Sequence, residues 1–124
     1  MKKFKLDKPR EECGVFGISD HDDASALAAL GLHALQHRGQ EGCGIVSFDG
    51  KTFHLEKRQG LVGDHFTDPV TIKKLPGRSA IGHNRYSTTG EVSLRNIQPF
   101  FADLYSGGVS LAHNGNLTNA VELR

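Results

Sequence analysis

The feature that most constrains this chain is an alternating apolar segment that begins abruptly at Cys13. The run Cys13-Gly14-Val15-Phe16-Gly17-Ile18 has the period-two pattern of a β-strand. Residues 1–12, which precede it, are mostly charged or polar and show no packing period of their own. The working protein is therefore predicted to begin at residue 13, with residues 1–12 as a leader.

A cysteine at a newly formed N-terminus would carry two reactive groups on one residue. The thiol can attack a carbonyl carbon, and the α-amine, with a reference pKa of about 7.7 to 8.0, can act as the base. The bond between Glu12 and Cys13 could be cut by attack of the thiol on the Glu12 carbonyl. The alternative is a buried core cysteine at the start of a strand, which is the common role of a free cysteine and the role we assign to Cys43.

Composition narrows the class of protein. The chain has 124 residues, 37% of them apolar, and a formal charge of +1 from 15 basic and 14 acidic residues that are mixed along it. Because charges of both signs are mixed, the sequence has no extended region of one charge that would attract nucleic acid or a membrane surface. It also has no stretch that approaches the roughly 20 consecutive apolar residues of a membrane span. Two cysteines without a C-x-x-C motif predict neither a disulfide framework nor a zinc site. One compact unit, or part of one, in the reducing cytoplasm is expected.

The first half of the chain predicts a helix and a hairpin. Cap-type residues before position 24 and helical spacing after it indicate a helix from about Ala24 to Gln36. The residues expected on its buried face are Leu27, Leu30, Gly31, Ala34 and Leu35. Residues 45–48 and 52–55 flank Asp49-Gly50, which predicts two adjacent strands joined by a turn.

The second half predicts shorter elements. Residues 60–77 are expected to form short helical turns and connections, and residues 79–83 a buried strand that leads into a polar loop over 84–90. Residues 109–113 alternate as another strand, and a helix is expected to start near residue 117. That helix has about two turns before Arg124, so the chain is expected to be the front part of a longer protein.

Three polar motifs could supply chemistry around Cys13. Leu35-Gln36-His37-Arg38-Gly39-Gln40-Glu41-Gly42 gathers polar side chains at a helix end, and Gly82-His83-Asn84-Arg85-Tyr86-Ser87-Thr88 places an arginine just past a strand. An arginine there could take a carboxylate in two parallel hydrogen bonds. His113-Asn114-Gly115-Asn116 offers an amide donor beside a glycine, as an oxyanion site requires.

Each motif taken alone also has an ordinary structural explanation. His37 and Arg38 suit a helix C-terminus, where cations are favoured. Arg85 could be an ordinary exposed arginine at the end of a strand. Asn114-Gly115 is a common turn, and Asn116 an ordinary helix cap. The residues singly therefore leave both interpretations open.

Together, the Cys13 strand and the three motifs occur in the order and spacing of one family. The chain resembles the N-terminal glutaminase domain of the amidophosphoribosyltransferase family, within the class II glutamine amidotransferases, and the likeness runs from Cys13 to Arg124. Sugar-phosphate aminotransferring relatives typically have Tyr-Arg-Gly-Tyr-Asp-Ser where this chain has residues 37–42, and a Trp in place of Tyr86. Those differences favour the purine-pathway family.

The resemblance implies a fold and a set of residue roles. The fold is α+β, the four-layer αββα N-terminal-nucleophile fold, expected to be partial because the sequence stops at residue 124. Cys13 is implied as the nucleophile, and Asn114 with Gly115 as the oxyanion hole. Arg85 is implied to bind the glutamine α-carboxylate, on a mobile loop over residues 85–96. The remaining residues implied in the glutamine pocket are Gly39, Tyr86 and His83.

The resemblance also implies an organisation and a reaction. Residues 1–12 would be a propeptide and 13–124 the glutaminase domain, with the phosphoribosyltransferase domain absent. Ammonia from glutamine would react with phosphoribosyl pyrophosphate in that domain to give 5-phosphoribosylamine, the first step of purine biosynthesis. No cofactor is expected in this chain; Mg²⁺ and, in one branch, a [4Fe-4S] cluster would lie past residue 124. The full-length enzyme is expected to be a homo-oligomer.

Two alternatives remain at this point. The chain could be the glutaminase domain of another class II enzyme, such as the sugar-phosphate aminotransferring type. It could also be a non-catalytic binding module with the same fold, in which Cys13 is an inert core residue.

Overall fold

The computed structural model describes residues 13–36, 41–86, 94–114 and 122, which form two β-sheets and several helices. The first sheet has four antiparallel strands in the order β1-β4-β2-β3, and the second is the hairpin β5-β6. The strands are β1 (Gly14–Ile18), β2 (Gly42–Phe48), β3 (Phe53–Gln59), β4 (Ser79–Arg85), β5 (Phe100–Leu104) and β6 (Gly107–Leu111). The helices are α1 (Ala24–Ala34), α2 (Val62–His65), α3 (Pro69–Lys73) and the 3-10 turn η2 (Leu94–Asn96).

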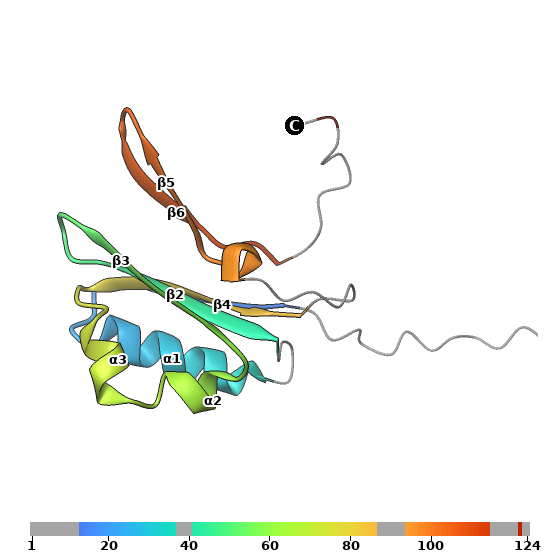
Figure 1. The fold of residues 1–124 in the computed structure, drawn as a ribbon. Coiled ribbons are helices and arrows are strands. Elements are labelled where there is room, and N and C mark those ends of the chain that lie inside the picture. The colour runs from blue at the N-terminus through green and yellow to red at the C-terminus, as the bar shows by residue number, and fades with distance from the viewer. Residues whose placement is uncertain (1–12, 37–40, 87–93, 115–121, 123–124) are drawn as a thin grey trace, which may run out of the picture.

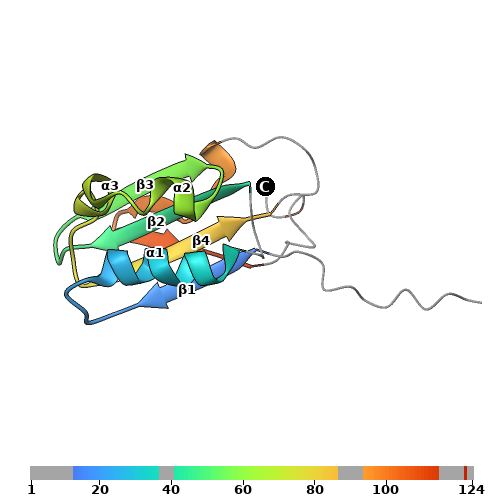
Figure 2. The same cartoon turned by 90° about the horizontal axis from the view of Figure 1, so that it is seen from below.

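These elements stack as helices, sheet and second sheet. Helices α1 to α3 cover one face of the four-stranded sheet, and the β5-β6 hairpin lies on the other side (Figure 1). Seen from below, α1 runs along β4 and β1 while α2 and α3 lie beneath β2 and β3 (Figure 2). The predicted α+β class is confirmed, and three layers of the αββα fold are built by the part of the chain that the structure describes.

The central position of β4 brings distant parts of the chain together. It pairs with β1 on one side and with β2 on the other, so that Asn84 lies opposite both Gly14 and Cys43. A strand covered on both faces needs apolar or fully bonded residues, and most of β4 is buried. The end of β4 therefore meets the start of β1 and the start of β2.

Helix α1 is confirmed, but its buried face differs from the predicted one. The buried residues are Ala24, Ser25, Ala28, Ala29 and Leu32. Leu30, predicted to be buried, is 65% exposed. Small residues allow the helix to approach the sheet closely, where Gly82 leaves room for Leu32: a Cβ at Gly82 would lie 3.0 Å from Leu32 Cγ. The face that carries the small residues and Leu32 therefore packs on the sheet, and Leu30 is left at the surface.

The β2-β3 hairpin and the short helices after it are confirmed. Both strands are longer than predicted, and Gly50 in the turn has φ +99°, a conformation that glycine adopts without strain. The carboxylate of Asp49 accepts the backbone N–H groups of Lys51 at 2.8 Å and Thr52 at 2.7 Å, and lies 2.7 Å from His54 Nε2. These bonds, the one with His54 first, lower the pKa of Asp49 to about 2.

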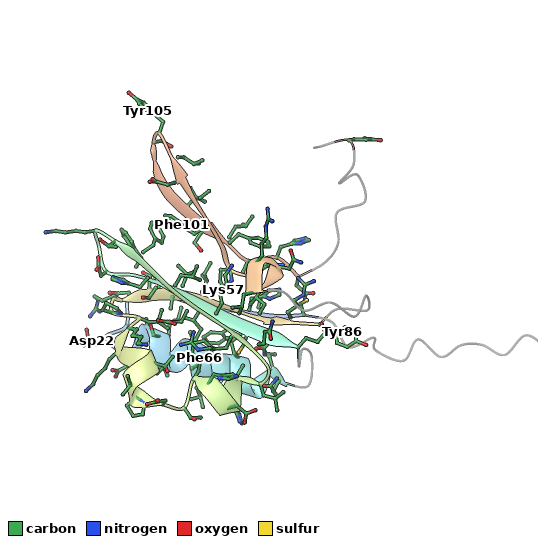
Figure 3. The ribbon with its side chains drawn as sticks, in the orientation of Figure 1. Asp22, Lys57, Phe66, Tyr86, Phe101 and Tyr105 are labelled. Carbon is green, nitrogen blue, oxygen red and sulfur yellow. The ribbon has the colours of Figure 1, made fainter. Side chains whose placement is uncertain are left out.

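Strand β5 was not predicted, and β6 lies two residues earlier than the predicted strand at 109–113. Phe101 of β5 packs on Phe53 of the first sheet with ring centroids 5.2 Å apart, while Tyr105 projects from the hairpin tip (Figure 3). All five β5 side chains are exposed. Because neither face of β5 is buried, its sequence lacks the alternation of apolar and polar residues from which a strand is predicted.

Several predicted elements lie outside the described residues: the leader, most of the loop over 84–90 and the helix after residue 117. Among the helices that the structure describes, none has the length and apolar character needed to cross a membrane.

Candidate active site

Cys13 lies at the start of β1, beside the end of β4. Its thiol donates to the backbone carbonyl of Tyr86 at 3.7 Å and accepts the Tyr86 N–H at 3.5 Å. The side chain is half-buried. Two predicted site residues that are 73 positions apart in the sequence are thus brought into direct contact.

Strand alternation divides the β4 motif between two faces of the sheet. Asn84 points toward α1, where its Nδ2 donates to the carbonyl of Leu32 at 2.7 Å. A Cβ at Gly14, opposite Asn84, would also meet α1, since it would lie 3.0 Å from Leu35 Cβ. Cys13, His83 and Arg85 alternate with these residues, so they lie on the opposite face, toward the second sheet.

The side chain of Arg85 is hydrogen-bonded to the segment before β5. Its Nη1 donates to the carbonyl of Asn96 at 2.6 Å. The carbonyl of Arg85 accepts the N–H of Glu41 at 3.1 Å, and the Glu41 carbonyl accepts the N–H of Gly60 at 2.9 Å. The backbone of Arg85 is therefore fixed by the first sheet, while its guanidinium extends to the chain that enters the second.

Four buried polar atoms at this end of the sheet have no hydrogen-bond partner among the residues described. They are Glu41 Oε2, His83 Nδ1, Asn84 Oδ1 and Arg85 Nε. Buried polar groups are nearly always bonded, so His83 Nδ1 and Arg85 Nε mark unmet bonding capacity on the face of the sheet that also carries Cys13, whereas Asn84 Oδ1 lies on the α1 face. Unmet bonding capacity of this kind is expected where a ligand or further polar groups approach.

His83 is fully buried, and its environment keeps it neutral. The pKa of His83 is lowered to about 4, chiefly by burial and to a smaller extent by the charges of Arg85 and His113, while a hydrogen bond to His113 opposes the change. That bond joins His83 Nε2 to the backbone carbonyl of His113 at 3.1 Å. A carbonyl oxygen only accepts, so Nε2 carries the proton and Nδ1 does not.

The predicted oxyanion residue Asn114 follows directly after His113 and is exposed. Since His113 contacts His83, and His83 pairs with Val15, the Asn114 turn is held close to the start of β1. The N–H of His113 is bonded by Gln98 Oε1 at 2.6 Å. Gln98 was not predicted as a site residue, because its only signal in the sequence is that it is a polar residue between Ile97 and Pro99, both of which are buried.

The structure leaves part of the predicted site unplaced. Gly39 and Gly115 lie outside the described residues, so their predicted roles stay predictions. Cys13, Tyr86, Arg85, His83 and Asn114 are placed at one end of the first sheet. Their roles toward a substrate also remain predictions.

Cys43 provides a contrast with Cys13. It lies on β2 within the apolar core, fully buried, and burial raises the pKa of its thiol to about 12. A thiol that stays protonated is a poor nucleophile, so the core role predicted for Cys43 fits its surroundings. No group of three or more His, Cys, Asp or Glu side chains among the described residues is arranged to hold a metal ion.

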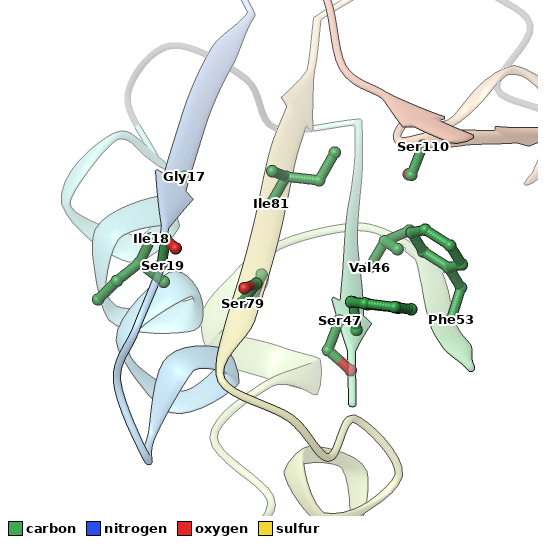
Figure 4. A pocket seen from close by; sticks show the side chains of 11 residues that line it. Gly17, Ile18, Ser19, Val46, Ser47, Phe53, Ser79, Ile81 and Ser110 are labelled. Atoms are coloured by element: carbon green, nitrogen blue, oxygen red, sulfur yellow. The ribbon is translucent and has the colours of Figure 1, made fainter. Parts of the chain in front are cut away.

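A cavity of about 420 Å³ lies at the other end of the same strands (Figure 4). Its lining is mainly apolar, with Val46, Phe53 and Ile81 from the first sheet and Ser110 from the hairpin. The β5-β6 hairpin diverges from the four-stranded sheet toward the hairpin tip (Figure 1). The cavity is therefore separate from the end of the sheet at which Cys13, His83 and Arg85 lie.

Comparison with known proteins identifies the class to which this fold and site belong. The family model for class-II glutamine amidotransferases matches residues 13–123, and the chain belongs to that family. Its relatives include amidophosphoribosyltransferases from Rhizobium etli, 66% identical over 95% of this chain, and from Bacillus subtilis, 49% identical over 92%. The chain spans 24% of the length of each of these relatives.

Solved structures give the same result. One, described as the allosteric regulatory enzyme of purine biosynthesis, is 46% identical, has a TM-score of 0.81, and is matched over 88% of this chain and 23% of its own. The glutamine phosphoribosylpyrophosphate amidotransferase of B. subtilis, solved with ADP and GMP, is 45% identical with a TM-score of 0.78, over the same shares of the two chains. The family predicted from the motifs is confirmed.

Proposed function

We propose that this chain is the glutaminase part of an amidophosphoribosyltransferase. It would hydrolyse glutamine and supply ammonia for the synthesis of 5-phosphoribosylamine from phosphoribosyl pyrophosphate. The observation that carries the proposal is the half-buried Cys13 thiol at the end of β4, on the same face of the sheet as His83 Nδ1 and Arg85 Nε, two buried atoms without a hydrogen-bond partner among the described residues. The 66% identity to the R. etli amidophosphoribosyltransferase supports the choice of this enzyme over the sugar-phosphate type.

The proposed reaction begins once residues 1–12 have been removed as a propeptide. The α-amine of Cys13 takes the thiol proton, and the thiolate attacks the side-chain amide carbon of glutamine. Collapse of the tetrahedral intermediate breaks the C–N bond, and the amide nitrogen takes the proton from the α-amine and leaves as ammonia. Water then attacks the γ-glutamyl thioester, which releases glutamate and restores the thiol.

The neighbouring residues have proposed roles in the same reaction. Asn114 and Gly115 would donate to the oxyanion of the tetrahedral intermediate. Arg85 would take the glutamine α-carboxylate with guanidinium N–H groups other than the one bonded to Asn96. Tyr86 would line the pocket next to the thiol, and Gly39 would add a backbone contact.

Cofactors and assembly are proposed for the full-length enzyme. A four-iron cluster takes four thiolates, and this sequence has two cysteines, of which Cys43 lies in the core. A cluster, like the Mg²⁺ of the phosphoribosyl transfer, would therefore be bound mainly or wholly by other parts of the enzyme. A homo-oligomer in the cytoplasm is proposed, and its free thiols suit a reducing compartment.

The test compares two nitrogen sources in the full-length enzyme. Cys13→Ser is expected to lower glutamine-dependent phosphoribosylamine synthesis at least about 1,000-fold and to leave ammonia-dependent synthesis within about twofold of wild type. Cys43→Ala is the matched control and should keep both activities. Equal loss of both activities in Cys13→Ser would assign Cys13 a structural role. An intact mass that still includes residues 1–12 in an active enzyme would refute the N-terminal mechanism.

A further inference from the structure

The backbone of His113, immediately before Asn114, is held on both sides by side chains from other parts of the chain. His83 Nε2 donates to its carbonyl at 3.1 Å, and Gln98 Oε1 accepts its N–H at 2.6 Å. Both backbone polar groups of this one residue are therefore bonded by side chains. His113 itself is exposed, so burial does not immobilise it.

Both holding residues are anchored to the first sheet. His83 is fully buried in the central strand β4 and pairs with Val15 of β1. The carbonyl of Gln98 lies against Gly44 of β2, so close that a Cβ at Gly44 would overlap its oxygen. The two side chains therefore connect residue 113 to the same rigid sheet that positions Cys13.

The His83 bond also sets the direction of the next amide. The carbonyl of His113 and the N–H of Asn114 belong to one planar peptide unit and point in opposite directions. Fixing the carbonyl therefore fixes the Asn114 N–H and the Cα from which its side chain projects. The imidazole can do this over a wide pH range, because burial keeps it neutral and Nε2 keeps its proton.

We propose that His83 and Gln98 are positioning residues that clamp the 113–114 peptide and so set the oxyanion donors of Asn114 relative to Cys13. The inference rests on the proposed glutaminase function. It assigns His83 a role through the backbone of His113, in place of the substrate contact predicted from its motif.

The first measurement is kinetic and uses the full-length enzyme. Removing an oxyanion donor costs about 100- to 1,000-fold in kcat, and a misplaced donor should cost less. His83→Leu and Gln98→Met are each expected to lower kcat for glutamine hydrolysis by about 10- to 100-fold with KM changed less than about threefold. His83→Gln keeps an N–H donor and Gln98→Glu an acceptor, and each should recover most of the loss. Ammonia-dependent synthesis should be unchanged in all four.

The control is Ser110→Ala, which removes a 3.0 Å bond from Ser110 Oγ to the Phe100 carbonyl within the same hairpin. It should keep the wild-type kcat. A rise in KM at constant kcat in His83→Leu would return His83 to substrate binding and overturn the clamp. Equal loss of glutamine- and ammonia-dependent activity would show a general structural role, which also overturns it.

A second measurement does not depend on activity. Hydrogen exchange of the His113 amide should accelerate at least about tenfold in Gln98→Met, because exchange reports the loss of that bond. Unchanged exchange would refute the clamp whatever the kinetics. If exchange responds as expected but wild-type enzyme neither hydrolyses glutamine nor reacts at Cys13 with a diazoketone analogue of glutamine, the proposed function fails while the clamp remains as a structural feature.

Discussion

Replacing Gly44 with alanine tests whether the segment before β5 is docked on the first sheet as tightly as the structure indicates. A Cβ at this position would overlap the carbonyl oxygen of Gln98, lie 3.1 Å from the carbonyl carbon and lie 3.2 Å from Pro99 Cδ. Two of these three atoms are backbone, so no rotamer change relieves the overlap. The segment would have to move away from β2 by about 1 Å to restore van der Waals contact.

The cost of that movement can be estimated. Overpacking a well-packed site costs about 1–3 kcal/mol, and loss of the Gln98–His113 hydrogen bond adds about 1 kcal/mol. Gly44→Ala is therefore expected to lower the free energy of unfolding by about 2–4 kcal/mol. Neither Gly44 nor the control position Gly17 has a positive φ, so backbone strain does not contribute at either.

Gly17→Ala on β1 is the matched control. A Cβ there would lie 3.7 Å from Ile81 Cγ2, an ordinary contact, and alanine is favoured over glycine in a strand by about 0.5–1 kcal/mol. The assay is urea unfolding of the 124-residue chain followed by circular dichroism. Equal stability of the two variants would refute the close docking of Gln98 on β2, and with it one anchor of the His113 clamp.

Three further predictions concern the core and the buried titratable groups. If α1 buries the face that the structure shows, Leu32→Ala should lower the free energy of unfolding by about 3 kcal/mol and Leu30→Ala by less than about 0.5 kcal/mol. A larger loss in Leu30→Ala than in Leu32→Ala would instead support the buried face predicted from the sequence. His83 has a lowered pKa of about 4, so the unfolded chain binds more protons between that pH and about 6.5, and stability should fall by about 3 kcal/mol as pH falls through this window. His83→Gln should flatten that part of the pH profile, and an unchanged slope would contradict a neutral buried ring. In native protein at pH 8, iodoacetamide should modify Cys43 at least about 100-fold more slowly than Cys13, since burial raises the pKa of Cys43 to about 12; equal rates would place Cys43 at the surface.

Sequence reasoning succeeded where local chemistry decides the structure. Asp49-Gly50 forms the predicted turn because a glycine with φ +99° and an aspartate bonding its own neighbours suffice to reverse the chain. The strand at Ser79 was predicted from its apolar run, which burial on both faces requires. The strand after Cys13 was predicted from its alternating apolar residues and is observed as β1, whereas the catalytic role of Cys13 stays a prediction.

Prediction from the sequence was wrong or incomplete where contacts with a distant part of the chain determine the structure. The buried face of α1 depends on glycines in the sheet beneath it, which periodicity within the helix does not contain. Strand β5 has no buried face, so hairpin pairing with β6 alone defines it. Gln98 contacts His113 only after both sheets have formed, and nothing around it in the sequence indicates that partner.

The insertion of β4 between β1 and β2 has a consequence for the order of events during synthesis. Cys13 is synthesised 73 residues before its neighbour Tyr86, and β4 has to enter between two strands made before it. Contacts of such long sequence separation form slowly. The Cys13 thiol therefore lacks its structural neighbours until β4 has been made and inserted, so the catalysis proposed for Cys13 would begin only late in the synthesis of this part of the protein.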